Sequence, residues 1–150
     1  MEKYTIIQKI ENGKQTGIWG IINKEGREFS YTYAVQKINN NYILFTENYF
    51  LDEADYDFPE RYEHFEVFET LSDVFEKLEK YNILPENMST SKGIKFFNDK
   101  QINLMRYIGE NNSLTNGNIY NILFTENECF CTVNDNHEKY LCSCKLFEKI

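Results

Sequence analysis

The stretch Phe29-Ser30-Tyr31-Thr32-Tyr33-Ala34-Val35 decides the predicted fold of the first half of the chain. Large apolar side chains alternate with smaller residues along it, and a period of two is typical of a β-strand with one buried face. Aromatic and β-branched residues, which favour strands, make up most of the stretch. The predicted buried face carries Phe29, Tyr31, Tyr33 and Val35.

Short turns join this strand to its predicted neighbours on both sides. Ile18 to Asn23 precedes it across the turn at Lys24-Glu25-Gly26, and Tyr42 to Thr46 follows it across Asn39-Asn40-Asn41. Glycine and asparagine are typical of such turns because they tolerate positive φ angles. Since short connections usually join antiparallel neighbours, the sequence predicts an antiparallel β-meander.

Two further elements complete the predicted N-terminal unit. Tyr4 to Ile10 is rich in residues that favour strands and precedes Asn12-Gly13, so we predict a first strand and a hairpin turn. Thr70 can cap a helix, because its hydroxyl can accept a hydrogen bond from the amide of Asp73. Apolar residues then recur at helical spacing and form one stripe, which consists of Leu71, Val74, Phe75, Leu78 and Tyr81.

An acidic loop is predicted from Glu47 to Glu63. Residues 47–80 contain 12 acidic and 3 basic side chains, a net charge of −9, whereas the whole chain carries −8. No apolar alternation survives in the loop, and Pro59 argues against the interior of a strand or helix. Loops of this length in compact domains are usually functional or disordered. The aromatic residues among its acids are Tyr49, Phe50, Tyr56, Phe58 and Tyr62.

The 150 residues fit one domain or two very small ones. Residues 84–93, with proline, glycine, asparagine and serine, are the predicted linker between residues 1–83 and residues 94–150. Short candidate strands after the linker, beginning with Ile94 to Phe97, predict a small β-barrel. The predicted fold class is α+β and mostly β, with an antiparallel meander, one packed helix and a small C-terminal barrel.

The predicted strand before Phe29 contains the sequence Gly17-Ile18-Trp19-Gly20-Ile21-Ile22-Asn23-Lys24-Glu25-Gly26. This segment resembles the start of a WG repeat, in which a G-x-W-G-x-I-[DN]-x-x-G strand and turn lead into a second strand. One copy is visible, over residues 17–46. Its glycines suit a tight turn and close approach of strands, and its tryptophan is expected to be a large apolar anchor. The resemblance implies a binding or structural surface rather than a reaction.

Residues 104–150 contain several short turn and strand motifs: Arg106-Tyr107-Ile108-Gly109, Leu114-Thr115-Asn116-Gly117-Asn118-Ile119-Tyr120, Val133-Asn134-Asp135 and Leu146-Phe147-Glu148. They resemble a small β-barrel module of the Src-homology-three-like kind. Such modules are common at the ends of short bacterial and phage proteins, including toxin-immunity proteins. The usual pattern has a glycine in the last hairpin turn, where this chain has His137. The resemblance implies a barrel and an immunity-type context.

Four cysteines form the patterns Cys129-x-Cys131 and Cys142-x-Cys144. Residues two apart in a strand share a face. A hairpin turn at Asn136-His137 would therefore place all four thiols on one face, where they are candidate ligands of a zinc ion. Zinc sites more often use C-x₂-C turns, and the alternative is that these small side chains fill part of the core.

Composition and motifs argue against several classes of function. A net charge of −8 disfavours binding to a nucleic-acid backbone. The chain has neither a run of 18 apolar residues nor an N-terminal signal pattern, so we expect a cytoplasmic protein that does not bind membranes. No motif assembles a nucleophile, a base and an oxyanion site, and no nucleotide-binding motif is present, so we expect no enzyme.

The acidic loop is the strongest functional signal in the sequence. Carboxylates attract a basic partner over a long range, and aromatic rings are typical anchors of an interface. We therefore predict a non-enzymatic protein that neutralises a basic protein partner, as an immunity-like or phage counter-defence inhibitor. A zinc-binding regulatory protein and a small-molecule-binding β module are the alternatives. The predicted partner-binding residues are Asp52, Glu53, Asp55, Tyr56, Asp57, Phe58, Glu60 and Glu63.

Overall fold

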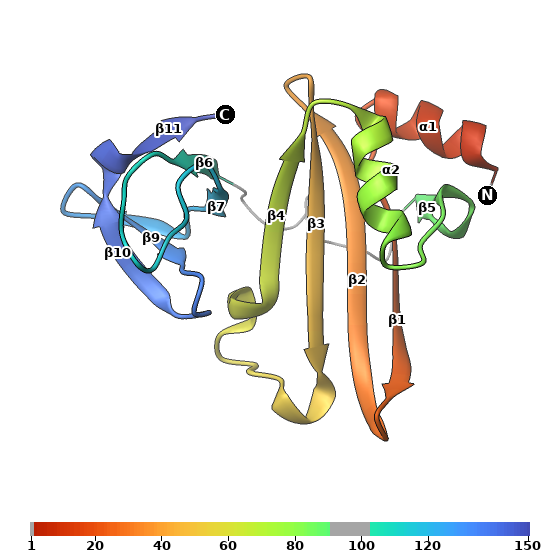
Figure 1. Ribbon diagram of the computed structural model, residues 1–150, viewed down its shortest axis with the longest axis horizontal. Coiled ribbons are helices and arrows are strands. Elements are labelled where there is room, and N and C mark those ends of the chain that lie inside the picture. The colour runs from red at the N-terminus through yellow and green to blue at the C-terminus, as the bar shows by residue number, and fades with distance from the viewer. Residues whose placement is uncertain (1, 91–102) are drawn as a thin grey trace.

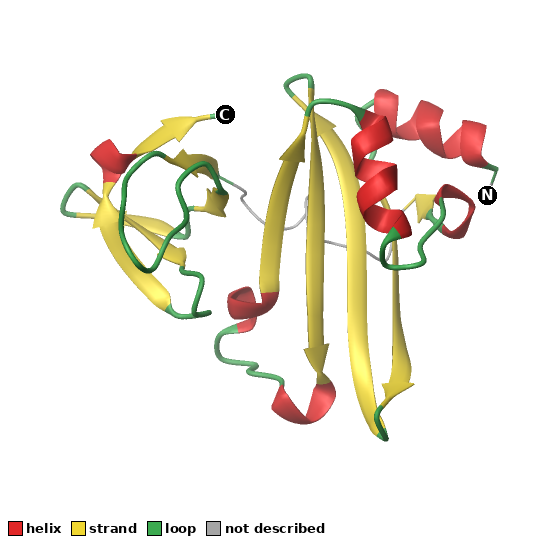
Figure 2. Ribbon diagram, viewed as in Figure 1, coloured by secondary structure: helices red, strands yellow, loops and turns green. Residues whose placement is uncertain are grey.

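The computed structural model describes residues 2–90 and 103–150. Figure 1 shows the arrangement of the elements, and Figure 2 shows that strands predominate over helices. The α-helices are α1 (Lys3–Glu11) and α2 (Leu71–Glu79), and short 3₁₀ helices are η1 (Leu51–Glu53), η2 (Pro59–Tyr62), η3 (Pro85–Asn87) and η4 (Cys144–Leu146). The strands are β1 (Thr16–Lys24), β2 (Arg27–Ile38), β3 (Asn41–Phe50), β4 (Glu63–Phe68), β5 (Ser89–Thr90), β6 (Leu104–Tyr107), β7 (Ile119–Asn121), β8 (Phe124–Glu126), β9 (Cys129–Val133), β10 (Lys139–Ser143) and β11 (Phe147–Lys149).

The N-terminal strands form one antiparallel sheet with the order β4-β3-β2-β1-β5. Strands β1 to β4 are neighbours in the order in which the chain visits them, so the predicted meander is confirmed. Both predicted turns inside it also form. Glu25 and Gly26 have φ angles of 56° and 77°, and Asn39 and Asn40 have 51° and 65°. Positive values at both central residues are typical of the tight hairpin turn that matches strand twist.

The two faces of this sheet are buried against different parts of the chain. Tyr33 and Val35 of β2 lie in a cluster with residues of α1 and α2, which cover one face (Figure 1). Ala34, between them, lies in a second cluster on the opposite face, together with Ile119 of β7. The side chains of residues 33–35 alternate between the two faces as predicted, but both faces are buried there. The second cluster joins the sheet to Ile119 of the C-terminal unit.

Helix α2 forms where the apolar stripe predicts it. The hydroxyl of Thr70 accepts a hydrogen bond from the amide of Asp73 over 3.2 Å, which caps the first turn. Val74 and Leu78, four residues apart on one side of the helix, are fully buried against the sheet.

Helix α1 replaces the strand that was predicted for residues 4–10, and that prediction is wrong. Ile6 and Ile10 lie one helical turn apart, and both are fully buried in the cluster beneath α1 and α2. Burial of these two side chains outweighs the weak local preference of tyrosine, threonine and isoleucine for strands. The predicted hairpin turn at Asn12-Gly13 is instead the end of this helix.

The WG-like segment runs along β1. A Cβ at Gly20 would lie 2.6 Å from the hydroxyl of Tyr31 on β2, so the Tyr31 ring crosses the strand over Gly20 and would have to shift for a larger residue. Trp19 leaves 59% of its surface exposed and does not form the apolar anchor that we expected.

Part of the predicted linker also belongs to the sheet, because Ser89 and Thr90 of β5 pair with β1. The predicted strand at Ile94 to Phe97 lies outside the described residues.

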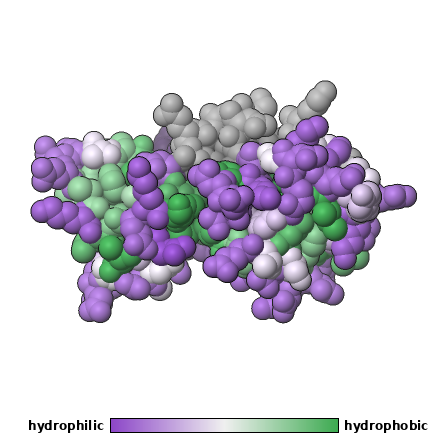
Figure 3. All heavy atoms as spheres, turned by 90° about the horizontal axis from the view of Figure 1, so that it is seen from above, coloured by the Kyte–Doolittle hydropathy of each residue, from purple (hydrophilic) through white to green (hydrophobic). Residues whose placement is uncertain are grey.

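The C-terminal unit consists of two three-stranded sheets, with the orders β11-β6-β7 and β10-β9-β8. These sheets do not close into a barrel, so this part of the prediction is wrong. Their strands have three to five residues, and within residues 103–150 no strand pairing joins one sheet to the other. They enclose a separate core that includes Tyr107, Leu114 and Phe147. Seen from above, hydrophilic side chains cover much of the surface, with hydrophobic patches between them (Figure 3).

The predicted acidic loop from Glu47 to Glu63 is too long at both ends. Strand β3 continues to Phe50, and β4 begins at Glu63. Residues 47–50 of β3 pair with β2, so the strand persists there without a clear apolar alternation. What remains between the two strands contains η1, one turn around residues 56–57 and η2.

Candidate binding surface of the acidic segment

Arg27, the first residue of β2, fixes the beginning of the acidic segment, which we define as residues 51–63. Its guanidinium donates to both carboxylate oxygens of Asp52, over 2.9 Å and 2.5 Å, and to Glu53 over 2.8 Å. It also stacks 3.9 Å from the centre of the Phe50 ring. The hydrogen bonds from Arg27 hold the pKa of Asp52 below its ordinary value. The first two carboxylates of the segment are therefore partly neutralised within the chain.

Asp55 shapes the tip of the acidic segment. Its Oδ1 accepts hydrogen bonds from the amides of Asp57 and Phe58, each over 3.1 Å. Its Oδ2 lies 3.2 Å from the guanidinium of Arg61. An aspartate that bonds the backbone two residues ahead stabilises a compact turn. Tyr56 lies inside this turn, and 82% of its surface is exposed.

The other aromatic rings of the region contact groups of the chain itself. Tyr49 and Tyr62 stack with their ring centres 5.0 Å apart. The ring of Phe58, a predicted partner contact, lies 4.8 Å from the ammonium group of Lys139 on β10. These rings stabilise the segment, and Tyr56 is the one that it presents to solvent.

The remaining predicted residues lie in two places. Asp57 is exposed beside Tyr56 at the tip. Glu60 and Glu63 are half-buried and line a cleft of about 280 Å³ between the N-terminal and C-terminal units. The structure thus brings Asp55, Tyr56 and Asp57 together at the tip. It places Glu60 and Glu63 in the lining of a cleft that the sequence did not predict.

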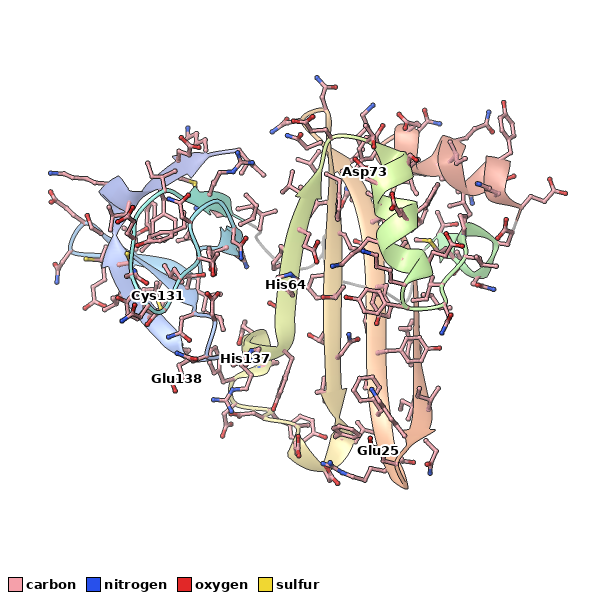
Figure 4. All side chains as sticks on the ribbon, in the orientation of Figure 1. Glu25, His64, Asp73, Cys131, His137 and Glu138 are labelled. Carbon is pink, nitrogen blue, oxygen red and sulfur yellow. The ribbon has the colours of Figure 1, made fainter. Side chains whose placement is uncertain are left out.

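Both histidines line this cleft. Figure 4 labels His64 on β4 and His137 in the turn between β9 and β10. The ring Nδ1 of His137 lies 2.9 Å from the carbonyl oxygen of Arg61, a contact that joins the two units. A hairpin joins β9 and β10, but its loop spans residues 134–138 instead of turning at Asn136-His137 as predicted. His137 in this loop adopts a φ angle of 63°, which glycine tolerates best.

Tyr120 and Asp135 supply fixed polar groups on the C-terminal wall of the cleft. The Tyr120 hydroxyl donates to Asp135 over 2.7 Å and accepts from the amide of Thr115 over 2.8 Å. The other carboxylate oxygen of Asp135 accepts from the Thr115 hydroxyl over 2.7 Å. Burial raises the pKa of Tyr120 to about 12, so its hydroxyl stays protonated at neutral pH. Such a wall can bind a polar or basic group through hydrogen bonds and charge.

The prediction that the four cysteines share one face of the hairpin is wrong. Cys131 pairs with Leu141, and Cys142 pairs with Phe130, so the register differs by one residue from the predicted one. A shift of one residue turns Cys142 to the opposite face of the hairpin. Burial raises the pKa of the thiols of Cys131 and Cys142, which disfavours the thiolate form that zinc requires. Among residues 2–90 and 103–150, no three His, Cys, Asp or Glu side chains are grouped to hold a metal ion.

Several residues of this surface were not predicted from the sequence. Arg27 and His137 are far from the acidic segment in the chain, and no spacing pattern links either residue to it.

No family model, curated protein or solved structure matches this chain. The WG-repeat and Src-homology-three-like resemblances therefore stay predictions. Within the described ranges, no helix is long and apolar enough to cross a membrane.

Proposed function

We propose that this protein is a non-enzymatic binding protein whose acidic segment captures a basic protein partner, in an immunity-like or counter-defence role. The observation that carries the proposal is the turn at residues 55–58, which presents the exposed ring of Tyr56 beside the carboxylate of Asp57. Tyrosine is enriched among the residues that dominate binding energy. Carboxylates around such an anchor accelerate association with a basic partner.

The internal contacts of the acidic segment support this proposal through the entropy of binding. A loop that becomes ordered only on association loses conformational freedom and therefore affinity. Arg27 holds one end of the segment, and Asp55 holds its tip. Towards the other end, the Tyr62 hydroxyl donates to the carbonyl of Glu53 over 2.7 Å. The binding surface is therefore ordered before a partner arrives.

The net charge of the acidic segment also favours a cationic partner. Residues 51–63 contain six acidic side chains and one basic side chain, a net charge of −5. Counting Arg27 and Lys139, which contact the segment, as two further positive charges still leaves −3. A surface of this kind is expected to bind less strongly as salt screens the interaction.

A capture experiment with charge-matched variants tests the proposal. The full chain is immobilised and exposed to native lysate at low and high salt, and the retained proteins are identified by mass spectrometry. The test variant is Asp57→Asn with Glu60→Gln. The control is Glu76→Gln with Glu79→Gln, two exposed carboxylates of α2, which removes the same charge elsewhere.

We expect the wild type and the control to retain basic proteins at low salt, and the test variant to lose them. Equal loss in both variants would mean that net charge alone drives capture. Equal retention by all three proteins would show that the acidic segment has no role in binding.

The cleft supports a second candidate function, the binding of a small polar molecule. It lies between the two units and combines the fixed hydroxyl of Tyr120 with the side chains of Glu63 and His137. Its volume of about 280 Å³ is close to the smallest ligand pockets. Native mass spectrometry of the purified chain tests this candidate, which predicts a retained small molecule. A spectrum with the mass of the bare chain and no added species would count against it.

A further inference from the structure

In the part of the chain that the structure describes, the outer edge of β1 is unpaired along most of its length. The two-residue turn at Glu25 and Gly26 makes Lys24 and Arg27 a hydrogen-bonded pair, and such pairs recur at every second residue of an antiparallel ladder. The amide and carbonyl groups of Trp19, Ile21 and Asn23 therefore point away from β2. Within residues 2–90 and 103–150, β5 is the strand that pairs with this edge, and it reaches only Thr16 and Gly17 (Figure 1).

This open edge lacks the features that usually prevent edge pairing. Natural sheet edges are protected by charged side chains, prolines, bulges or covering segments. Residues 18–23 contain neither a charge nor a proline, and β1 pairs with β2 without a bulge. The exposed fractions are 59% for Trp19, 53% for Ile21 and 48% for Ile22. Exposed apolar residues on an unpaired strand are typical of a surface that another strand covers.

We propose that this edge pairs with the same edge of a second copy of the chain, and that two copies form one continuous antiparallel sheet. The free length of the edge determines the register. It is bounded by β5 at Gly17 and by the turn at Glu25, so its centre is Ile21. A two-fold axis at Ile21 pairs Trp19 of each copy with Asn23 of the other. Each of these pairs and the central pair then forms two hydrogen bonds.

In the neighbouring registers, some outward-pointing backbone groups of the edge would have no strand residue opposite them to pair with. Moving the axis to Gly20 would place Asn23 of the second copy opposite Gly17, whose outer edge already pairs with Ser89. Moving it to Ile22 would place Trp19 opposite Glu25, which has a φ angle of 56° and has left the strand. The edge is therefore complementary to itself in one antiparallel register.

The side chains also fit this register. Ile22 and Gly20 lie on the same face of β1, and an axis at Ile21 places Ile22 of the second copy directly opposite Gly20. The space above Gly20 is filled by the ring of Tyr31, so the incoming Ile22 contacts an aromatic ring. Cross-strand pairs of a β-branched side chain with an aromatic one stabilise sheets.

The charge distribution permits this approach despite the net charge of −8 on each copy. Residues 16–24 contain no acidic side chain and one basic side chain, Lys24. Residues 51–63 carry much of the negative charge, and the carboxylates of this segment that lie near the end of β1, Asp52 and Glu53, are paired with Arg27. Another extended segment could pair with the same backbone groups. A second copy is favoured because only its register and its Ile22 side chain are matched to this edge.

Sedimentation of the full chain over a range of concentrations tests the proposal, with Ile21→Pro as the disrupting variant. The amide of Ile21 points outward, so proline removes an intermolecular hydrogen bond without removing one to β2. We expect a dimer for the wild type and a monomer for Ile21→Pro with an unchanged circular dichroism spectrum. A wild type that stays monomeric, or a dimer that survives the proline, would overturn the proposal.

Cross-linking keeps the test decisive if the proline variant does not fold. In the proposed register, two Ile21→Cys residues face each other about 5.5 Å apart, within the range for a disulfide. Two Asn23→Cys residues would be about 13 Å apart along the strands and serve as the matched control. We expect an oxidised dimer from Ile21→Cys beyond that of the wild type, and none from Asn23→Cys. Cross-linking of neither variant, or of Asn23→Cys alone, would contradict the proposed pairing.

Discussion

Arg27 and Asp52 are joined by two parallel hydrogen bonds, although 25 residues separate them in the chain. Arg27 lies beside the tight turn between β1 and β2, and Asp52 lies in η1, directly after β3. Because a guanidinium fork fixes both distance and orientation, this contact ties the acidic segment to the most regular part of the sheet.

Replacement of Arg27 should loosen the acidic segment without unfolding the chain. Arg27→Lys keeps the charge but loses the fork, and Arg27→Ala loses both. We expect hydrogen exchange at residues 51–58 to be fastest in Arg27→Ala, slower in Arg27→Lys and slowest in the wild type, with only a small loss in the free energy of unfolding, because exposed ion pairs contribute little. The pKa of Asp52 should rise towards its ordinary value in Arg27→Ala, as measured by NMR titration. Unchanged exchange at these residues would show that the clamp does not order the segment.

Removal of the Tyr56 ring should weaken binding and leave stability unchanged. The ring is 82% exposed, so Tyr56→Ala is expected to alter the free energy of unfolding by less than about 0.5 kcal/mol. As an interface anchor, it should contribute about 2 kcal/mol to the affinity for the captured partner. Calorimetric titration measures this loss. Tyr56→Phe, which keeps the ring, should restore most of it, and equal affinities for all three proteins would remove Tyr56 from the interface.

Glu66 should stabilise the fold in a pH-dependent manner. Its carboxylate lies 3.3 Å from His64 and 3.7 Å from Lys77. The hydrogen bond to His64 and the nearby charge of Lys77 hold the pKa of Glu66 below its ordinary value. A carboxyl whose pKa is lower in the folded chain stabilises it above the unfolded-state pKa, and this stabilisation is lost as the pH falls through the folded-state pKa.

Glu66→Gln should therefore lower the free energy of unfolding by about 0.2–1 kcal/mol at neutral pH. The difference from the wild type should shrink as the pH falls through the acidic range. Thermal unfolding of both proteins across this range checks the prediction, with the exposed Glu76→Gln as control. A difference that persists or grows in acid would contradict the assigned ion pairs.

The thiols should differ in reactivity because of their burial. Cys131 and Cys142 are 2% and 7% exposed, and burial raises the pKa of both. Cys129 and Cys144 are only half-buried. We expect a thiol reagent to modify Cys129 and Cys144 first and the other two only on unfolding, as followed by mass spectrometry. Protection of all four that ends when a chelator is added would favour the zinc-binding alternative.

Local patterns predicted the meander because it depends on interactions close in sequence. The alternation around Tyr33 and the turns at Gly26 and Asn40 each act within a few residues, and the structure contains all of them. Helix α1 was not predicted, because Ile6 and Ile10 are helical through burial in a core formed with β2 and the segment around η3, which are distant in the chain.

The candidate surface shows the same limit. The sequence predicts that acids and aromatic residues gather near Tyr56, but it contains no sign that Arg27 or Lys139 contacts them. The cysteine register failed for a related reason, since one residue more or less in the β9–β10 turn reverses the faces of Cys142 and its neighbours.

The affinity of the captured partner, measured as a function of salt concentration, shows whether carboxylates at the tip and cleft of the acidic segment bind a cationic protein. We expect tight binding at low salt and a steep loss as salt increases. For Asp57→Asn with Glu60→Gln, we expect a weaker affinity with a shallower salt dependence. Identical affinities and salt dependence for this variant and the wild type would contradict this role of the carboxylates.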